Sequence, residues 1–115
     1  MRAPLKKDFT HDCSSPEEGC QNLINAVFHQ AYNDLVRSLR KGYRMALQAK
    51  HEDRTMVRWK MEDAAAVHMN EANRLKKWIK DVLPIWRDIN PQILINRAYV
   101  ESGADFSRLR DGDER

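Results

Sequence analysis

The sequence predicts an all-α fold, a small helical bundle of four to five helices with a long central helix. Only four glycines and four prolines occur in 115 residues, and β-branched residues are few, which disfavours a sheet. Apolar residues recur at alternating spacings of three and four, the period of an amphipathic helix. Charged residues make up 32% of the chain, above the usual ~25%, as long solvated helix faces require.

The length is that of one domain. We expect a flexible N-terminal arm at 1–14, a helical domain at 15–102 and a flexible tail at 103–115, unless Phe106 and Leu109 dock. No apolar run approaches the ~18 residues of a membrane span, and the N-terminus lacks a signal-peptide pattern. A cytoplasmic protein without membrane contact is therefore expected. Cys13 and Cys20 fit a reducing compartment, which disfavours a disulfide between them.

The first helix begins at a strong local signal. Ser15 can cap it, Pro16 suits its first turn, and Glu18 completes a capping box. An apolar stripe follows, and Gly42 is the expected end of the helix. The stripe consists of Leu23, Ile24, Val27, Phe28, Ala31, Tyr32, Leu35, Val36 and Leu39.

A second apolar pattern starts at Tyr43 and predicts a short helix at 43–50 and a long helix at 54–83. The residues between them form a turn with Asp53 as the cap, although a single bent helix is the alternative. Pro84 should end the long helix. A second apolar face on these helices indicates a central position in the bundle or a surface covered by a partner. Its members are Met45, Ala49, Met56, Trp59, Val67 and Trp78.

The last helix should begin with Asn90 as cap and Pro91 in its first turn. Its apolar residues carry it to about Ser102 and Gly103, where a glycine favours termination.

Positive charge is concentrated in a basic segment, residues 37–60. This segment carries +6, whereas the whole chain carries only +3. Concentrated cations with interleaved aromatic residues are typical of a nucleic-acid footprint. They are also typical of a solvated helix face and a charged helix end. The candidate contacts are Arg37, Arg40, Lys41, Arg44, Arg54, Arg58 and Lys60, with Tyr43 and Trp59 as stacking or packing partners.

Four of these cations share one face only if the first helix runs on through Gly42. Trp59 is flanked by Arg58 and Lys60 and faces away from the main stripe, so it either contacts a partner or packs within the chain. Trp78 and Trp86 are expected in the core.

Neither a metal site nor a catalytic site is predicted. The possible zinc ligands His11, Cys13, Cys20 and His29 lack the two tight pairs that a tetrahedral site uses. The cluster at 51–53 lacks the second histidine of a zincin helix, and no loop-rich segment indicates a pocket that would shift a pKa. We expect no enzyme activity and no cofactor.

Several segments resemble a family of small uncharacterised proteins from phages and mobile elements of Gram-positive bacteria. The resemblance lies in Val27–Asp34, which matches an apolar-x-x-Gln-Ala-x-x-Asp pattern, although Leu35 stands where that family has an aromatic residue. It continues in Ala72–Leu75 with Trp78 and Ile79, and in Trp86, Asp88–Pro91, Ile93 and Leu94. The resemblance implies a helical bundle in a bacterial, prophage-like setting and supplies no site residues.

The leading hypothesis is a non-enzymatic binding protein that acts on nucleic acid or on a nucleic-acid-handling protein through the basic segment. A DNA-binding regulator and an anti-CRISPR-type inhibitor of a host defence complex both remain open. The alternative is a homodimeric structural or assembly protein in which a second copy covers the second apolar face.

Overall fold

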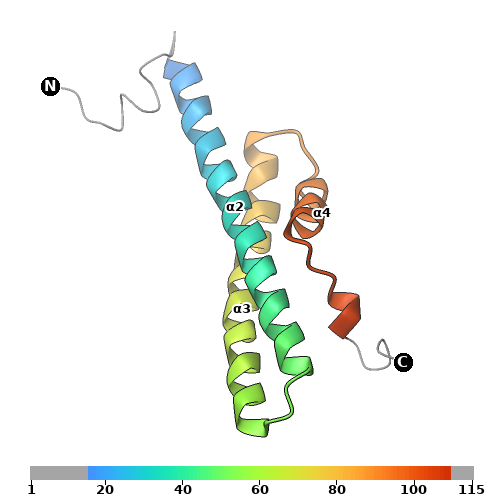
Figure 1. Cartoon of the computed structure of the whole chain (residues 1–115). Helices are drawn as coiled ribbons and strands as arrows, with labels where there is room; N and C mark the ends of the chain where they lie inside the picture. The colour runs from blue at the N-terminus through green and yellow to red at the C-terminus, as the bar shows by residue number, and fades with distance from the viewer. Residues whose placement is uncertain (1–15, 110–115) are drawn as a thin grey trace, which may run out of the picture. The chain divides into compact units, whose positions relative to one another are not determined.

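The computed structural model describes residues 16–109, and within this range every regular element is helical (Figure 1). The elements are α2 (Pro16–Lys50), α3 (Thr55–Trp86), α4 (Pro91–Ser102) and a 3-10 turn, η1 (Phe106–Leu109). The all-α prediction is confirmed. The expected count of four to five helices is not, because this range holds three α-helices and one 3-10 turn. None of these helices is both long and apolar enough to span a membrane.

The first helix does not end at Gly42, so that prediction was wrong. The segments 15–42 and 43–50 form one helix, α2, with no break at the glycine. A Cβ atom at position 42 would lie 2.8 Å from Met69 Sδ and 3.4 Å from His68 Cβ. The glycine therefore permits close approach between α2 and α3. Tertiary packing outweighs the ~1 kcal/mol that glycine costs inside a helix.

The predicted turn near residues 51–53 is confirmed, which rules out a single bent helix. His51 and Glu52 donate their backbone N–H groups to the carbonyls of Gln48 and Ala49, which satisfies two acceptors at the end of α2. Asp53 is not the cap: Arg54 occupies the N-cap position of α3 without a side-chain capping bond.

Pro84 does not end α3, which continues to Trp86. A proline so close to a helix end removes one hydrogen bond, and few bonds remain beyond it to be lost. The last turn is closed by the Arg87 N–H, which donates to the Leu83 carbonyl at 2.9 Å.

The predicted boundaries of the last helix are confirmed. Asn90 caps α4 by accepting a hydrogen bond from the Gln92 N–H at 3.0 Å, and Pro91 is the first residue of the helix. Gly103 follows in the left-handed conformation with φ 74°, a conformation that a side chain would make costly.

The chain divides into two compact units, residues 1–31 and 32–115, at a boundary inside α2. In the described part of the first unit, Phe28 and Ala31 are buried, whereas Leu23 and Val27 are exposed. In the second unit the core combines residues of α2, α3 and α4. Its largest fully buried side chains are Leu35, Leu39, Ile79 and Ile95.

The C-terminal segment docks through Phe106, as the sequence allowed. The ring of Phe106 makes edge-to-face contacts with Tyr43, at 5.6 Å between centroids, and with Tyr99, at 6.1 Å. Lys50 Nζ also donates to the Arg108 carbonyl at 2.6 Å. The arm at 1–14 and the end of the tail at 110–115 lie outside the described residues.

Candidate nucleic-acid interface

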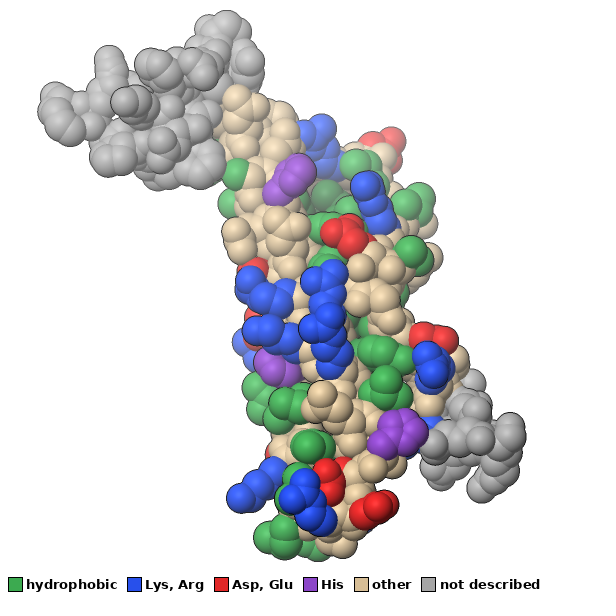
Figure 2. Space-filling model, viewed as in Figure 1, with side chains coloured by type: hydrophobic (Ala, Val, Ile, Leu, Met, Phe, Trp, Pro, Cys, Tyr) green, Lys and Arg blue, Asp and Glu red, His purple; other side chains and the backbone are tan. Residues whose placement is uncertain are grey.

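Because α2 runs through Gly42, four of the predicted cations share one helix face. Arg37, Arg40, Lys41 and Arg44 recur at i, i+3, i+4 and i+7 on the side of α2 opposite Leu39. We call these four residues the basic ridge. Arg37, Lys41 and Arg44 are exposed and Arg40 is half-buried. Figure 2 shows Lys and Arg side chains gathered over the middle of α2.

The ridge keeps most of its positive charge. Arg37 pairs with Asp34 at 2.5 Å, and Arg40 Nη2 donates to the Glu101 carbonyl at 3.3 Å. Lys41 and Arg44 have no charged or hydrogen-bonding side-chain partner among residues 16–109. Like charges at these spacings repel by roughly 0.2–0.5 kcal/mol per pair. An anionic partner would remove this repulsion.

Arg54 is neutralised within the turn between the helices. Its Nε donates to Glu52 Oε2 at 2.8 Å, and its backbone N–H donates to the same oxygen at 3.0 Å. The hydrogen bond from the guanidinium is the main reason that the pKa of Glu52 falls to about 2. Arg54, like Arg37, therefore carries a charge that a neighbouring carboxylate already neutralises. Figure 2 shows acidic side chains among the cations at this end of the molecule.

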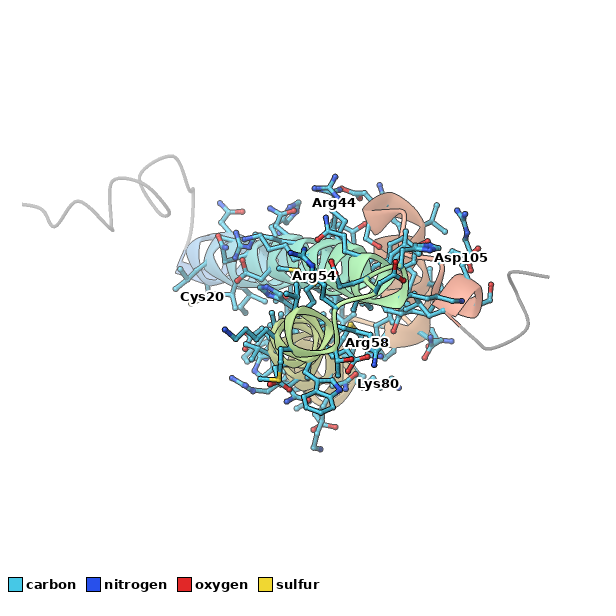
Figure 3. The ribbon with its side chains drawn as sticks, turned by 60° about the horizontal axis from the view of Figure 1, so that its bottom comes forward. Cys20, Arg44, Arg54, Arg58, Lys80 and Asp105 are labelled. Atoms are coloured by element: carbon cyan, nitrogen blue, oxygen red, sulfur yellow. The ribbon has the colours of Figure 1, made fainter. Side chains whose placement is uncertain are left out.

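The predicted contacts on α3 do not lie on the same side as the basic ridge. Figure 3 shows Arg44 on the side of α2 turned away from α3, whereas Arg58 lies on α3 itself. Trp59 and Lys60 are exposed on the outer side of α3, away from its buried residues Ala65, Ala72 and Ile79. The basic segment is thus two surfaces, one on each helix.

The prediction that Tyr43 stacks on a partner was wrong. It is only 9% exposed and packs on Phe106, because an unbroken α2 places it on the same side as Leu39. Trp59 is 53% exposed and remains available to a partner. Trp86, expected in the core, is 52% exposed at the end of α3, whereas Trp78 is half-buried.

Sequence reasoning missed the contacts that reach α2 from the C-terminal third. Tyr32 Oη donates to Glu101 Oε1 at 2.5 Å. Burial, followed by this bond, raises the pKa of Tyr32. Tyr32 and Arg40 are each more than 60 residues from Glu101 in sequence, so no local pattern could have indicated these contacts.

No group of three or more His, Cys, Asp or Glu residues in the described range is placed to hold a metal ion. Cys20 is an exposed free thiol, and the candidate ligands His11 and Cys13 lie outside that range. Comparison of the chain with protein-family models, curated proteins and solved structures found no match. The functional argument therefore depends on the geometry of this chain.

Proposed function

We propose that the protein is a non-enzymatic binding protein, encoded by a phage or another mobile element, that acts on nucleic acid or on a host nucleoprotein complex in the bacterial cytoplasm. Either a regulator or an anti-CRISPR-type inhibitor would use such a contact. The basic ridge is the observation that supports this function, because it concentrates four cations on an exposed helix face. Within the described residues, Arg37 is the ridge cation that forms an ion pair with a carboxylate.

The length of the basic ridge fits a contact with the phosphate backbone of DNA. Arg37 and Arg44 are seven residues apart, about 10 Å along an α-helix. Phosphates of one DNA strand are spaced about 3.4 Å along the duplex axis, so the ridge spans roughly three of them. Cations that contact phosphates position a protein without reading bases. We therefore expect binding that depends little on sequence and strongly on salt.

The test compares two triple variants with the same loss of charge. Arg37→Gln/Lys41→Gln/Arg44→Gln removes three ridge cations, and Arg74→Gln/Lys80→Gln/Arg108→Gln removes three exposed cations elsewhere. Fluorescence anisotropy with mixed-sequence duplex DNA, and separately with RNA, should show affinity that falls with ionic strength. The ridge variant should reduce the salt slope by about 0.9 for each lost phosphate contact on duplex DNA. Equal losses in both variants, or no binding by the wild type, would contradict direct nucleic-acid binding through the ridge.

A second candidate function is that of a homodimeric structural or assembly protein. It is favoured by exposed apolar residues on the outer side of α3, where Met56 is 64% exposed and Val67 is 66% exposed. Met45 and Trp78, the other members of the expected dimer face, are half-buried. Self-association would therefore centre on the N-terminal half of α3.

A further inference from the structure

The outer side of α3 carries a stripe with the spacing of a coiled-coil seam. Met56, Lys60, Asp63 and Val67 follow one another at intervals of four, three and four residues, which places them on one helix face. All four are exposed, and the face is opposite the buried residues Ala65 and Ala72. We call these four residues the α3 stripe.

The two charges at the centre of the stripe form no ion pair within residues 16–109. Lys60 and Asp63 are three residues apart, yet neither forms an ion pair with any residue in the described range. Further along α3, Arg74 pairs with Glu71 and Lys77 pairs with Asp81. The stripe therefore has a cation and an anion, neither paired with a described residue, between two exposed apolar side chains.

The α3 stripe can pair with the α3 stripe of a second copy that runs in the opposite direction. Lys60 and Asp63 lie one residue before Met61 and one residue after Glu62, and Met56 and Val67 lie five residues before and after the same pair. A two-fold axis between positions 61 and 62 would therefore place Lys60 against Asp63 of the second copy. It would also place Met56 against Val67. A parallel pair would instead place like charges together, which is destabilising.

We propose that this chain self-associates as an antiparallel dimer through the α3 stripe, with two Lys60–Asp63 ion pairs between two Met56–Val67 contacts. A two-fold interface uses one self-complementary patch on both copies. Trp59 flanks the stripe on the same edge as Ala66, and the two-fold axis would bring it against this small, exposed residue of the second copy. The proposal gives a register to the second candidate function, and it does not depend on nucleic-acid binding because the basic ridge lies on α2.

The stripe spans about 16 Å of helix, less than an interface of standard size needs, so the dimer should be weak and concentration-dependent. Sedimentation velocity over a concentration series without nucleic acid should resolve a monomer–dimer equilibrium. Lys60→Asp alone or Asp63→Lys alone places like charges at both ion-pair positions and should weaken dimerisation about tenfold or more. The double variant Lys60→Asp/Asp63→Lys exchanges the charges and should restore it. Thermal unfolding of each variant is the folding control.

Cysteine cross-linking tests the register separately, in chains with Cys13→Ser/Cys20→Ser. A mixture of Met56→Cys and Val67→Cys chains should form a disulfide on oxidation, whereas either chain alone should not, because position 56 faces position 67 of the second copy and not position 56. A monomer at all concentrations would overturn both the register and self-association. A dimer that tolerates the single charge changes, or that cross-links equally in each chain alone, would overturn the register and leave self-association standing.

Discussion

Glu52 shows how a short polar contact organises the start of a helix. Its carboxylate accepts hydrogen bonds from the backbone N–H and the guanidinium of Arg54, the N-cap residue of α3. A negative charge is favourable at this position because the N-terminus of a helix carries partial positive charge. Glu52 therefore supplies the acidic contact that was expected from the adjacent Asp53.

The contact with Arg54 also lowers the pKa of Glu52, and this effect can be measured. The pKa lies at about 2, against an ordinary value of 4.5, chiefly because of the hydrogen bond from Arg54. A lowered carboxyl pKa stabilises the folded state above the ordinary pKa, and this stabilisation is lost as the pH falls towards 2. Arg54→Gln should raise the pKa of Glu52 by about one to two units, as measured by NMR titration. Arg58→Gln, which removes an equal charge one turn away, should leave the pKa unchanged, and an equal rise in both variants would contradict this explanation.

Gly42 is the second informative residue, since it lies in an unbroken helix yet faces Met69. Gly42→Ala should be nearly neutral in the wild type, because the gain in helix propensity is offset by displacement of the Met69 side chain. In a Met69→Ala background the same substitution should stabilise the fold by about 1 kcal/mol. Chemical denaturation of the wild type, the two single variants and the double variant gives the coupling free energy between positions 42 and 69. Identical effects of Gly42→Ala in both backgrounds would show that the close approach has no energetic consequence.

Where α2 and α3 end determines which side chains each helix exposes and which it buries. Because α2 does not stop at Gly42, one of its faces carries Leu35 and Leu39 into the core while the opposite face carries the basic ridge. α3 ends at Trp86, past Pro84, and both Ile85 and Trp86 are exposed there. The surfaces that the helices present therefore depend on two boundaries that differ from the sequence prediction, which ended the first helix at Gly42 and the long helix at Pro84.

The 3-10 turn η1 is held mainly by one side chain. Phe106 packs edge-to-face between Tyr43 and Tyr99, and such aromatic pairs contribute about 0.5–1.5 kcal/mol each beyond the area they bury. Phe106→Ala should lower the free energy of unfolding by about 2 kcal/mol, less than for a fully buried phenylalanine because Phe106 is half-buried. Urea denaturation measures the loss.

Arg108→Ala is the matched control in the same turn. The Lys50 bond goes to the backbone carbonyl of residue 108, so this change should cost less than about 0.5 kcal/mol. A Phe106→Ala protein as stable as the control would show that η1 does not dock in solution.

At the scale of the molecule, the positive charge of the basic segment is divided between two helices. The ridge on α2 and the cations beside Trp59 on α3 face different sides, so one flat anionic surface would not meet both at once. This division assigns the nucleic-acid proposal to α2 and the self-association proposal to α3. Each can be tested with variants that leave the other surface intact.

The sequence by itself determined the elements whose signals are local. Apolar periodicity predicted the helical fold, Asn90 and Pro91 predicted the start of α4, Gly103 predicted its end, and residues 51–53 predicted the turn. The concentration of charge at 37–60 is likewise a property of the amino-acid order alone. Each of these features depends on residues a few positions apart, so the pattern alone carries the information.

The tertiary structure determined which of those residues lie on the same surface. α2 continues through Gly42, which lies close to Met69, and this continuity aligns Arg37 with Arg44 on one face. Docking of Phe106 buried Tyr43, and the position of α3 separated Trp59 from the ridge. Contacts between residues distant in sequence override local propensity because close packing is a property of the assembled core. The charge of the segment was set by its residues, and its division into two surfaces was set by the fold.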